Sequence, residues 1–176
     1  LELADRMRES TRAILPEGSG IRIHIEQDPP SHVGLGTGTQ AALAAGMAAN
    51  QLYDRGMSVR DIAIAVGRGG TSGIGVASFE SGGFILDSGH KFSEKGAFKP
   101  SAASKSPPAS ILFQQPFPDW EIVLAIPDVV GAHDAYEVDI FGKECPIPLS
   151  EVQELSHIIL MGTLSGVVEG DIEAFG

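Results

Sequence analysis

One segment constrains the fold of this chain more than any other. Residues 29–40 read Pro-Pro-Ser-His-Val-Gly-Leu-Gly-Thr-Gly-Thr-Gln and lead directly into an alanine-rich stretch at residues 41–50. An extended segment, a glycine-rich loop and a helix start therefore follow one another. In this order the loop N–H groups and the positive end of the helix dipole converge on one point, which favours an anion.

The residues of this loop suit an anion site individually. Gly34, Gly36 and Gly38 allow positive φ angles and let a ligand approach the backbone closely. Thr37 and Thr39 offer hydroxyl donors and a helix N-cap. The imidazole of His32 lies within the same stretch, and as a hydrogen-bond donor it would also favour a phosphate. We call residues 34–39 the Gly/Thr loop, and the candidate anion-binding residues are Ser31, His32, Gly34, Leu35, Gly36, Thr37, Gly38 and Thr39.

The Gly/Thr loop matches neither of the two commonest phosphate loops. A Walker loop has Lys and then Ser or Thr after its last glycine, whereas Thr39 and Gln40 follow Gly38 here. The dinucleotide-binding fingerprint places its third glycine at the position of Thr39. A tight strand-to-helix turn without a ligand remains the structural alternative, because a Gly-x-Gly-x-Gly pattern alone is weak.

Composition narrows the function classes. The net charge of −11 argues against nucleic acid or an anionic membrane as a partner, and no apolar run approaches the roughly 20 residues of a membrane span. The single Cys145 excludes an internal disulfide and, with no visible signal peptide, indicates a cytoplasmic protein. The five histidines are scattered without zinc spacing, so no metal ligands are assigned. The chain does not begin with Met, and we expect it to be part of a longer protein.

Hydrophobic periodicity and capping residues predict a mixed α+β chain. The expected helices are residues 1–15, about 38–52, 58–66 with Ser58 as N-cap, and 149–175 with a break near 162–166. The expected strands are residues 21–25, 84–86 and 120–126. A segment rich in Ser, Ala, Pro and Lys marks a loop or linker at 96–117. It separates an N-terminal domain at 1–95, whose start is missing, from the beginning of a C-terminal domain at 118–176.

Two motifs together carry a resemblance to the GHMP kinase superfamily. Residues 30–39 are similar to that superfamily's Pro-x-x-x-Gly-Leu-Gly-Ser-Ser-Ala loop. Residues 70–75 (Gly-Thr-Ser-Gly-Ile-Gly), followed by Gly82 and Gly83, are similar to its Pro-Ser-Gly-Ile-Asp stretch and trailing Gly-Gly. The order and spacing of the motifs agree with the superfamily, which makes the pair more specific than either motif alone.

Within the superfamily, the chain most resembles the beta-ribofuranosylaminobenzene 5'-phosphate synthase family of methanopterin biosynthesis, over residues 32–40, 67–91 and 147–157. The resemblance implies a two-domain α+β fold, of which this is a partial chain. Its N-terminal part would be ribosomal protein S5 domain 2-like, with a left-handed β-α-β crossover near the loop. A ferredoxin-like C-terminal part would start near Trp120.

The resemblance also implies an activity: condensation of phosphoribosyl pyrophosphate with 4-aminobenzoate or 4-hydroxybenzoate, with release of CO2 and pyrophosphate. The alternative is an ATP-dependent small-molecule kinase of the same superfamily. Several GHMP kinases place a catalytic Asp where this chain has Gly75, which can do no acid–base work and so favours the synthase. A third reading is a ligand-binding module that has lost its chemistry.

Five further residues are candidates for the implied chemistry. Arg68 lies between glycines in an acidic protein and would clamp a phosphate. His90 and Lys91 would meet pyrophosphate or the benzoate carboxylate, and Glu80 would stabilise positive charge on the ribosyl centre. Ser72 would donate to the ligand. The structural alternatives are a solvated arginine, an ordinary solvated turn and a plain helix cap.

Cofactors and assembly follow from the same resemblance. No acidic pair like the Asp-Asp signature of ordinary phosphoribosyltransferases is present, so dependence on Mg²⁺ is left open. ATP is expected only under the kinase alternative. The expected ligands are small molecules, and a homodimer is compatible with the resemblance.

Overall fold

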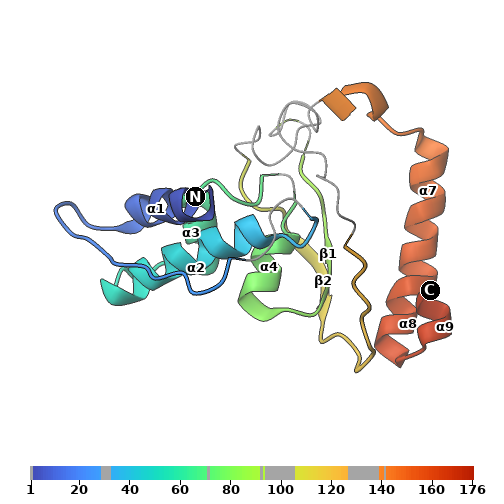
Figure 1. Cartoon of the computed structure of the whole chain (residues 1–176). Helices are drawn as coiled ribbons and strands as arrows, with labels where there is room; N and C mark the ends of the chain where they lie inside the picture. The colour runs from blue at the N-terminus through green and yellow to red at the C-terminus, as the bar shows by residue number, and fades with distance from the viewer. Residues whose placement is uncertain are drawn as a thin grey trace.

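The computed structural model describes residues 2–28, 33–70, 72–91, 93, 106–126, 139–140 and 142–176. Within them, a layer of helices lies on one side of a two-stranded sheet, and the C-terminal helices lie on the other side (Figure 1). The helical layer contains α1 (Glu2–Ile14), α2 (Thr37–Leu52), α3 (Val59–Ala65) and α4 (Ile74–Ser81). The remaining elements are β1 (Phe84–Asp87), β2 (Ile111–Gln115), α7 (Leu149–Ile158), the π-helix η2 (Ile159–Thr163), α8 (Leu164–Glu169) and α9 (Ile172–Phe175).

The hydrophobic core lies among the N-terminal helices. Ile14 of α1, Leu43 of α2 and Ile62 of α3 are at most 2% exposed and belong to one cluster. Complete burial of such a side chain contributes roughly 1.5–3 kcal/mol. The helices approach closely at Gly46, where a Cβ would lie 2.7 Å from Ile62 Cγ2. The helices predicted at 1–15, 38–52 and 58–66 are confirmed by α1, α2 and α3.

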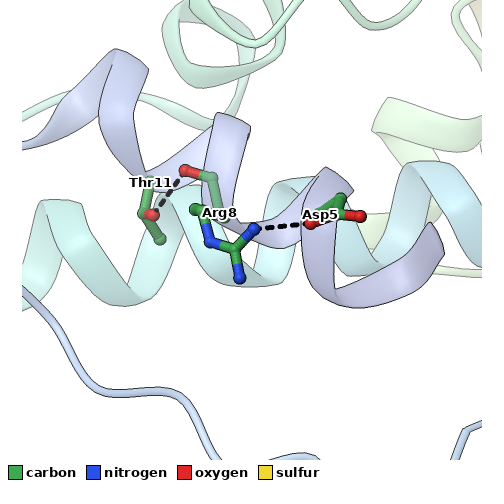
Figure 2. A network of polar contacts seen from close by, with 3 residues as sticks. All are labelled: Asp5, Arg8 and Thr11. Carbon is green, nitrogen blue, oxygen red and sulfur yellow. Dashed lines mark hydrogen bonds and ion pairs between the residues drawn. The ribbon is translucent and has the colours of Figure 1, made fainter. Parts of the chain in front are cut away.

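Helix α1 satisfies its own core-facing hydroxyl groups. Thr11 is buried, and its Oγ1 donates to the carbonyl oxygen of Arg8 at 2.9 Å. The Arg8 side chain instead pairs with Asp5 through an Nη1–Oδ1 contact of 2.5 Å at the exposed surface (Figure 2). Buried Ser10 likewise donates to the carbonyl oxygen of Arg6 at 2.9 Å. Because these hydroxyls bond within the helix, α1 can bury them against α2.

Strands β1 and β2 form an antiparallel pair. Phe84 lies opposite Gln115 and Leu86 opposite Phe113, with an irregularity between Leu86 and Asp87. Strand β1 confirms the prediction at 84–86. Strand β2 lies within the range 96–117 that we assigned to a loop or linker, so part of that range is sheet. Its sequence Ile-Leu-Phe-Gln-Gln has no period-two pattern that would have identified it.

The predictions of strands at 21–25 and 120–126 are wrong. The three isoleucines of 21–25 are half-buried and the residues between them are exposed, as the alternation predicts. However, neither segment pairs with another strand in the described part of the chain. Alternation reports which side faces inward, whereas a strand also needs a neighbouring backbone for its hydrogen bonds.

The break predicted at 162–166 in the last helix is also misplaced. Helix α7 continues through η2 into α8, and the chain turns only at Gly170, whose φ is 70°. Gly166 lies inside α8 and does not end the helix. Its missing side chain makes room for α9, because a Cβ there would lie 2.6 Å from the backbone nitrogen of Phe175. The apolar side chains of α7 are exposed, with Leu155 at 58%.

Aromatic rings join the C-terminal helices to the sheet. The Phe175 ring centroid lies 5.7 Å from that of Phe84, 5.9 Å from Phe117 and 5.2 Å from Trp120. Aromatic pairs at such distances contribute about 0.5–1.5 kcal/mol beyond their buried area. Among the described residues, no helix is both long and apolar enough to cross a membrane.

Ser58 and Asp61 form a capping box at the start of α3. Ser58 Oγ accepts a hydrogen bond from the Asp61 N–H, and Asp61 Oδ2 accepts one from the Ser58 N–H, both at 3.1 Å. Hydrogen bonds from the hydroxyl and N–H groups of Ser58, aided by the charge of Arg60, hold the pKa of Asp61 below its ordinary value of 3.8. This confirms the predicted N-cap.

Gly46→Ala tests the packing of the helical layer. Alanine is the better helix former by roughly 1 kcal/mol, but its Cβ has no room against Ile62, and overpacking costs about 1–3 kcal/mol. We expect a lower free energy of unfolding, measured as a lower urea midpoint. Gly20→Ala is the control, because a Cβ there meets no atom within 4 Å. Equal losses in the two variants would contradict the packing argument.

Ser58→Ala tests the capping box. We expect the free energy of unfolding to fall by about 1 kcal/mol at neutral pH. Because the folded pKa of Asp61 is depressed, its contribution is present above the unfolded pKa and disappears as pH falls through the folded pKa. The difference between Ser58→Ala and the parent should therefore shrink in acid denaturation curves. Ser78→Ala, at an exposed position of α4, should show no such pH-dependent difference.

Candidate anion-binding site

The Gly/Thr loop enters α2 through a left-handed residue. Gly36 is the N-cap of α2 with φ 67° and ψ 12°, and Gly34 has φ 80°. A side chain at Gly36 would be strained in this conformation, which confirms why glycine is required there. Gly38 is instead an ordinary residue of the first helical turn. The predicted threonine N-cap is wrong, because Gly36 holds that position and makes no side-chain capping bond.

The N-terminus of α2 is open to an anion, whereas that of α4 is already neutralised. The first turn of α2 has no acidic residue and no side-chain cap, although the helix is 16 residues long. At α4, Asp87 Oδ2 accepts a hydrogen bond of 2.6 Å from the N–H of its N-cap, Gly73. The other carboxylate oxygen of Asp87 accepts from the Gly89 N–H at 2.9 Å. Among the described residues, no carboxylate in the first turn of α2 offsets the positive end of its dipole.

The second glycine-rich segment packs directly on the Gly/Thr loop. Gln40 Nε2 donates a 2.9 Å hydrogen bond to the carbonyl oxygen of Gly75. A Cβ at Gly75 would lie 3.1 Å from Thr39 Cγ2, so a side chain at residue 75 would require the Thr39 side chain to shift by a few tenths of an ångström. The two motifs that carried the resemblance thus form one structural unit.

Sequence reasoning missed Arg6. A Cβ built at Gly38 would lie 2.5 Å from Arg6 Nη1, so the guanidinium lies against the first turn of α2. Its Nη2 pairs with Glu2 Oε1 at 2.8 Å. From sequence alone, Glu2 and Arg6 form an ordinary i,i+4 surface pair. Only the packing of α1 along α2 shows that Arg6 reaches the Gly/Thr loop.

Arg68 lies close to Arg6. The Arg68 side chain is half-buried, and its pKa is lowered by burial and then by the charge of Arg6, against the opposing effect of Glu9. Both arginines line a cavity of about 230 Å³ between α1 and α3, together with Glu9 and Ser10. Arg68 is therefore not the freely solvated surface arginine of the structural alternative.

The other sequence candidates are more scattered. Ser72 immediately precedes Gly73, the N-cap of α4, so it is not the helix cap of the structural alternative. Glu80 is exposed near the far end of α4, roughly 9 Å along the helix from its start at 1.5 Å per residue. Lys91 is exposed. The candidates Ser31 and His32 lie outside the described residues.

His90 is held by a loop carbonyl. Its Nε2 lies 2.8 Å from the carbonyl oxygen of Pro107, which requires the proton on Nε2. Its Nδ1 is buried and has no hydrogen-bond partner among the described residues. This arrangement ties the turn after β1 to the segment before β2.

An apolar cavity adjoins the Gly/Thr loop on the side of α1. It measures about 460 Å³, and its lining includes Leu3 and Met7 of α1, Leu35 and Thr37 of the loop region, and Phe79 of α4. No group of three or more His, Cys, Asp or Glu side chains suited to a metal ion occurs in the described ranges. The site thus combines the start of α2, two arginines and an apolar hollow.

Gln40→Ala tests the link between the two glycine segments. Loss of the hydrogen bond to Gly75 should lower the free energy of unfolding by about 1 kcal/mol. We also expect faster amide hydrogen exchange in residues 34–39 and 73–75. Gln51→Ala, at an exposed position near the other end of α2, is the matched control. Unchanged exchange in both segments would show that Gln40 does not hold them together.

Comparison with known proteins finds a matching family and several similar sequences. Residues 1–83 match the model for the GHMP kinases N terminal domain. The chain is 50% identical over 159 residues to the beta-ribofuranosylphenol 5'-phosphate synthase of Archaeoglobus fulgidus, covering 90% of this chain and 51% of the relative. For the proteins of the same name in Methanothermobacter thermautotrophicus and Methanocaldococcus jannaschii, identity is 44% over 180 residues and 45% over 163.

Those two alignments cover 99% and 90% of this chain, but 55% and 49% of the relatives. The chain thus spans about half the length of each relative it matches. The resemblance inferred from the two glycine motifs is confirmed over nearly the whole chain. The chain is a homologue of the beta-ribofuranosylphenol 5'-phosphate synthases, and its first 83 residues carry the N-terminal domain of the GHMP kinase superfamily.

Proposed function

We propose that the complete protein joins phosphoribosyl pyrophosphate to a para-substituted benzoate and releases CO2 and pyrophosphate. The observation that carries the proposal is the identity of 44–50% to three synthases over 90–99% of this chain. The start of α2 beside Arg6, which shares a cavity with Arg68, supports it, because both sugar phosphate groups and pyrophosphate need positive charge.

The reaction exchanges one bond at each reacting carbon. The bond from ribose C1 to pyrophosphate breaks, and the leaving group takes the electron pair. The ring carbon that carries the carboxylate then forms the new C–C bond to C1. Its bond to the carboxylate breaks, the electron pair returns to the ring, CO2 leaves and aromaticity is restored.

The protein contributes mainly positioning and electrostatics in this proposal. The Gly/Thr loop and Arg6 neutralise the departing pyrophosphate, whose charge increases as it leaves. The apolar cavity beside Leu35 and Thr37 offers space for an aromatic ring next to that anion. Holding the ring carbon in line with C1 and excluding water would prevent hydrolysis of the ribosyl centre.

The acceptor in this proposal is 4-hydroxybenzoate. The three relatives carry the name beta-ribofuranosylphenol 5'-phosphate synthase, and a phenol is the product expected from a hydroxybenzoate. We further infer that the complete protein has the S5 domain 2-like and ferredoxin-like parts implied by the resemblance. Its dependence on Mg²⁺ and its assembly into a homodimer are to be measured on that complete protein.

The kinase alternative finds less support at Gly75. That position bears no carboxylate, and its backbone packs so closely on Thr39 that even a Cβ would come within 3.1 Å. An aspartate there would require the Thr39 side chain to shift. The synthase needs no base at this point, because no alcohol is deprotonated.

The test uses the complete protein with phosphoribosyl pyrophosphate and carboxyl-labelled 4-hydroxybenzoate or 4-aminobenzoate. We expect labelled CO2 that requires the phosphoribosyl donor and not ATP, with faster release from the hydroxy acid. Each reaction is repeated with Mg²⁺ and with a chelator. Consumption of ATP with an alcohol, and no CO2 from either acid, would instead support the kinase.

A further inference from the structure

Two arginines from separate elements of an acidic chain line one cavity. Arg6 projects from α1 and Arg68 follows α3, and both border the cavity of about 230 Å³ that also contains Ser10. The chain has only 12 lysines and arginines and a net charge of −11. Two guanidinium groups brought together in such a chain repel each other, and burial weakens their hydration.

The described residues do not fully balance this charge. Arg6 pairs with Glu2, but no described carboxylate lies within ion-pair distance of the Arg68 guanidinium. Glu9 lines the cavity, yet its side chain is exposed and forms no ion pair with either arginine in this part of the chain. Burial and the charge of Arg6 lower the pKa of Arg68. An anion in the cavity would relieve both effects.

Arg6 borders both the cavity and the Gly/Thr loop. The same guanidinium that lines the cavity lies against Gly38 in the first turn of α2. One water occupies about 30 Å³ in the liquid, so the cavity has room for a phosphate group. Positive charge therefore extends from the α2 N-terminus past Arg6 to Arg68, which suits a ligand with two separate phosphate groups.

We propose that the cavity between Arg6 and Arg68 is a second phosphate subsite, which binds the 5'-phosphate of the phosphoribosyl donor. The Gly/Thr loop binds the pyrophosphate of the same molecule, and Arg6 contacts both groups. This inference rests on the proposed function for the identity of the ligand.

The test measures binding of ribose 5-phosphate and of pyrophosphate separately, by titration calorimetry on the complete protein. Arg68→Gln should weaken ribose 5-phosphate about tenfold or more and change pyrophosphate affinity less than about twofold. Arg6→Gln should weaken both ligands, because Arg6 borders both subsites. Arg8→Gln is the matched control, since Arg8 lies on the same helix but pairs with Asp5 at the surface (Figure 2).

Glu9→Gln separates a ligand site from a structural charge pair. If the cavity binds phosphate, removal of its one lining carboxylate should tighten ribose 5-phosphate binding severalfold. If Glu9 only balances Arg68, the variant should lose stability and leave the affinity unchanged, which would overturn the proposal. This variant keeps both arginines, so it remains informative if Arg68→Gln fails to fold.

The two proposals fail in different ways. Labelled CO2 release that survives in Arg68→Gln with an unchanged KM for phosphoribosyl pyrophosphate would overturn the second subsite and leave the synthase intact. Selective loss of ribose 5-phosphate binding in that variant, from a protein that releases no CO2 from either acid, would support the subsite and reject the synthase.

Discussion

The packing of α1 along α2 is the contact on which the rest of this structure depends. The two helices run in the same direction, since Arg6 lies beside Gly38 and Ile14 lies beside Gly46. Glycines on α2 allow the close approach, and the buried side chains of Ile14, Leu43 and Ile62 stabilise it. The same contact forms the core at one end of α2 and places the guanidinium of Arg6 against the Gly/Thr loop at the other end.

The N-termini of α2 and α4 differ in the charged groups that lie against them. Helix α2 has no charged residue, so no side chain of its own offsets the dipole at its N-terminus, and the guanidinium of Arg6, which pairs with Glu2, lies beside it. Asp87 neutralises the neighbouring start of α4. An anion would therefore meet one attractive helix end and not two.

Residue types and spacing predicted the local features well. The left-handed glycines, the Ser58 cap, the first three helices and the strand at 84–86 follow from backbone sterics and hydrogen bonding within a few residues. Features that depend on contacts between distant parts of the chain were predicted less well. Pairing of the strand predicted at 21–25 depends on a partner backbone, and the exposed stripe of α7 depends on what packs against it.

The candidate site divides in the same way. The sequence by itself determined a glycine-rich turn into an uncharged helix, and its resemblance to the GHMP kinases predicted a phosphate ligand for that turn. Only the tertiary structure decided that Gly75 packs on Thr39, that Arg6 joins the loop, and that Arg6 and Arg68 share a cavity. The physical reason is range: φ preferences and capping act between near neighbours, whereas the position of a guanidinium depends on how separate helices pack.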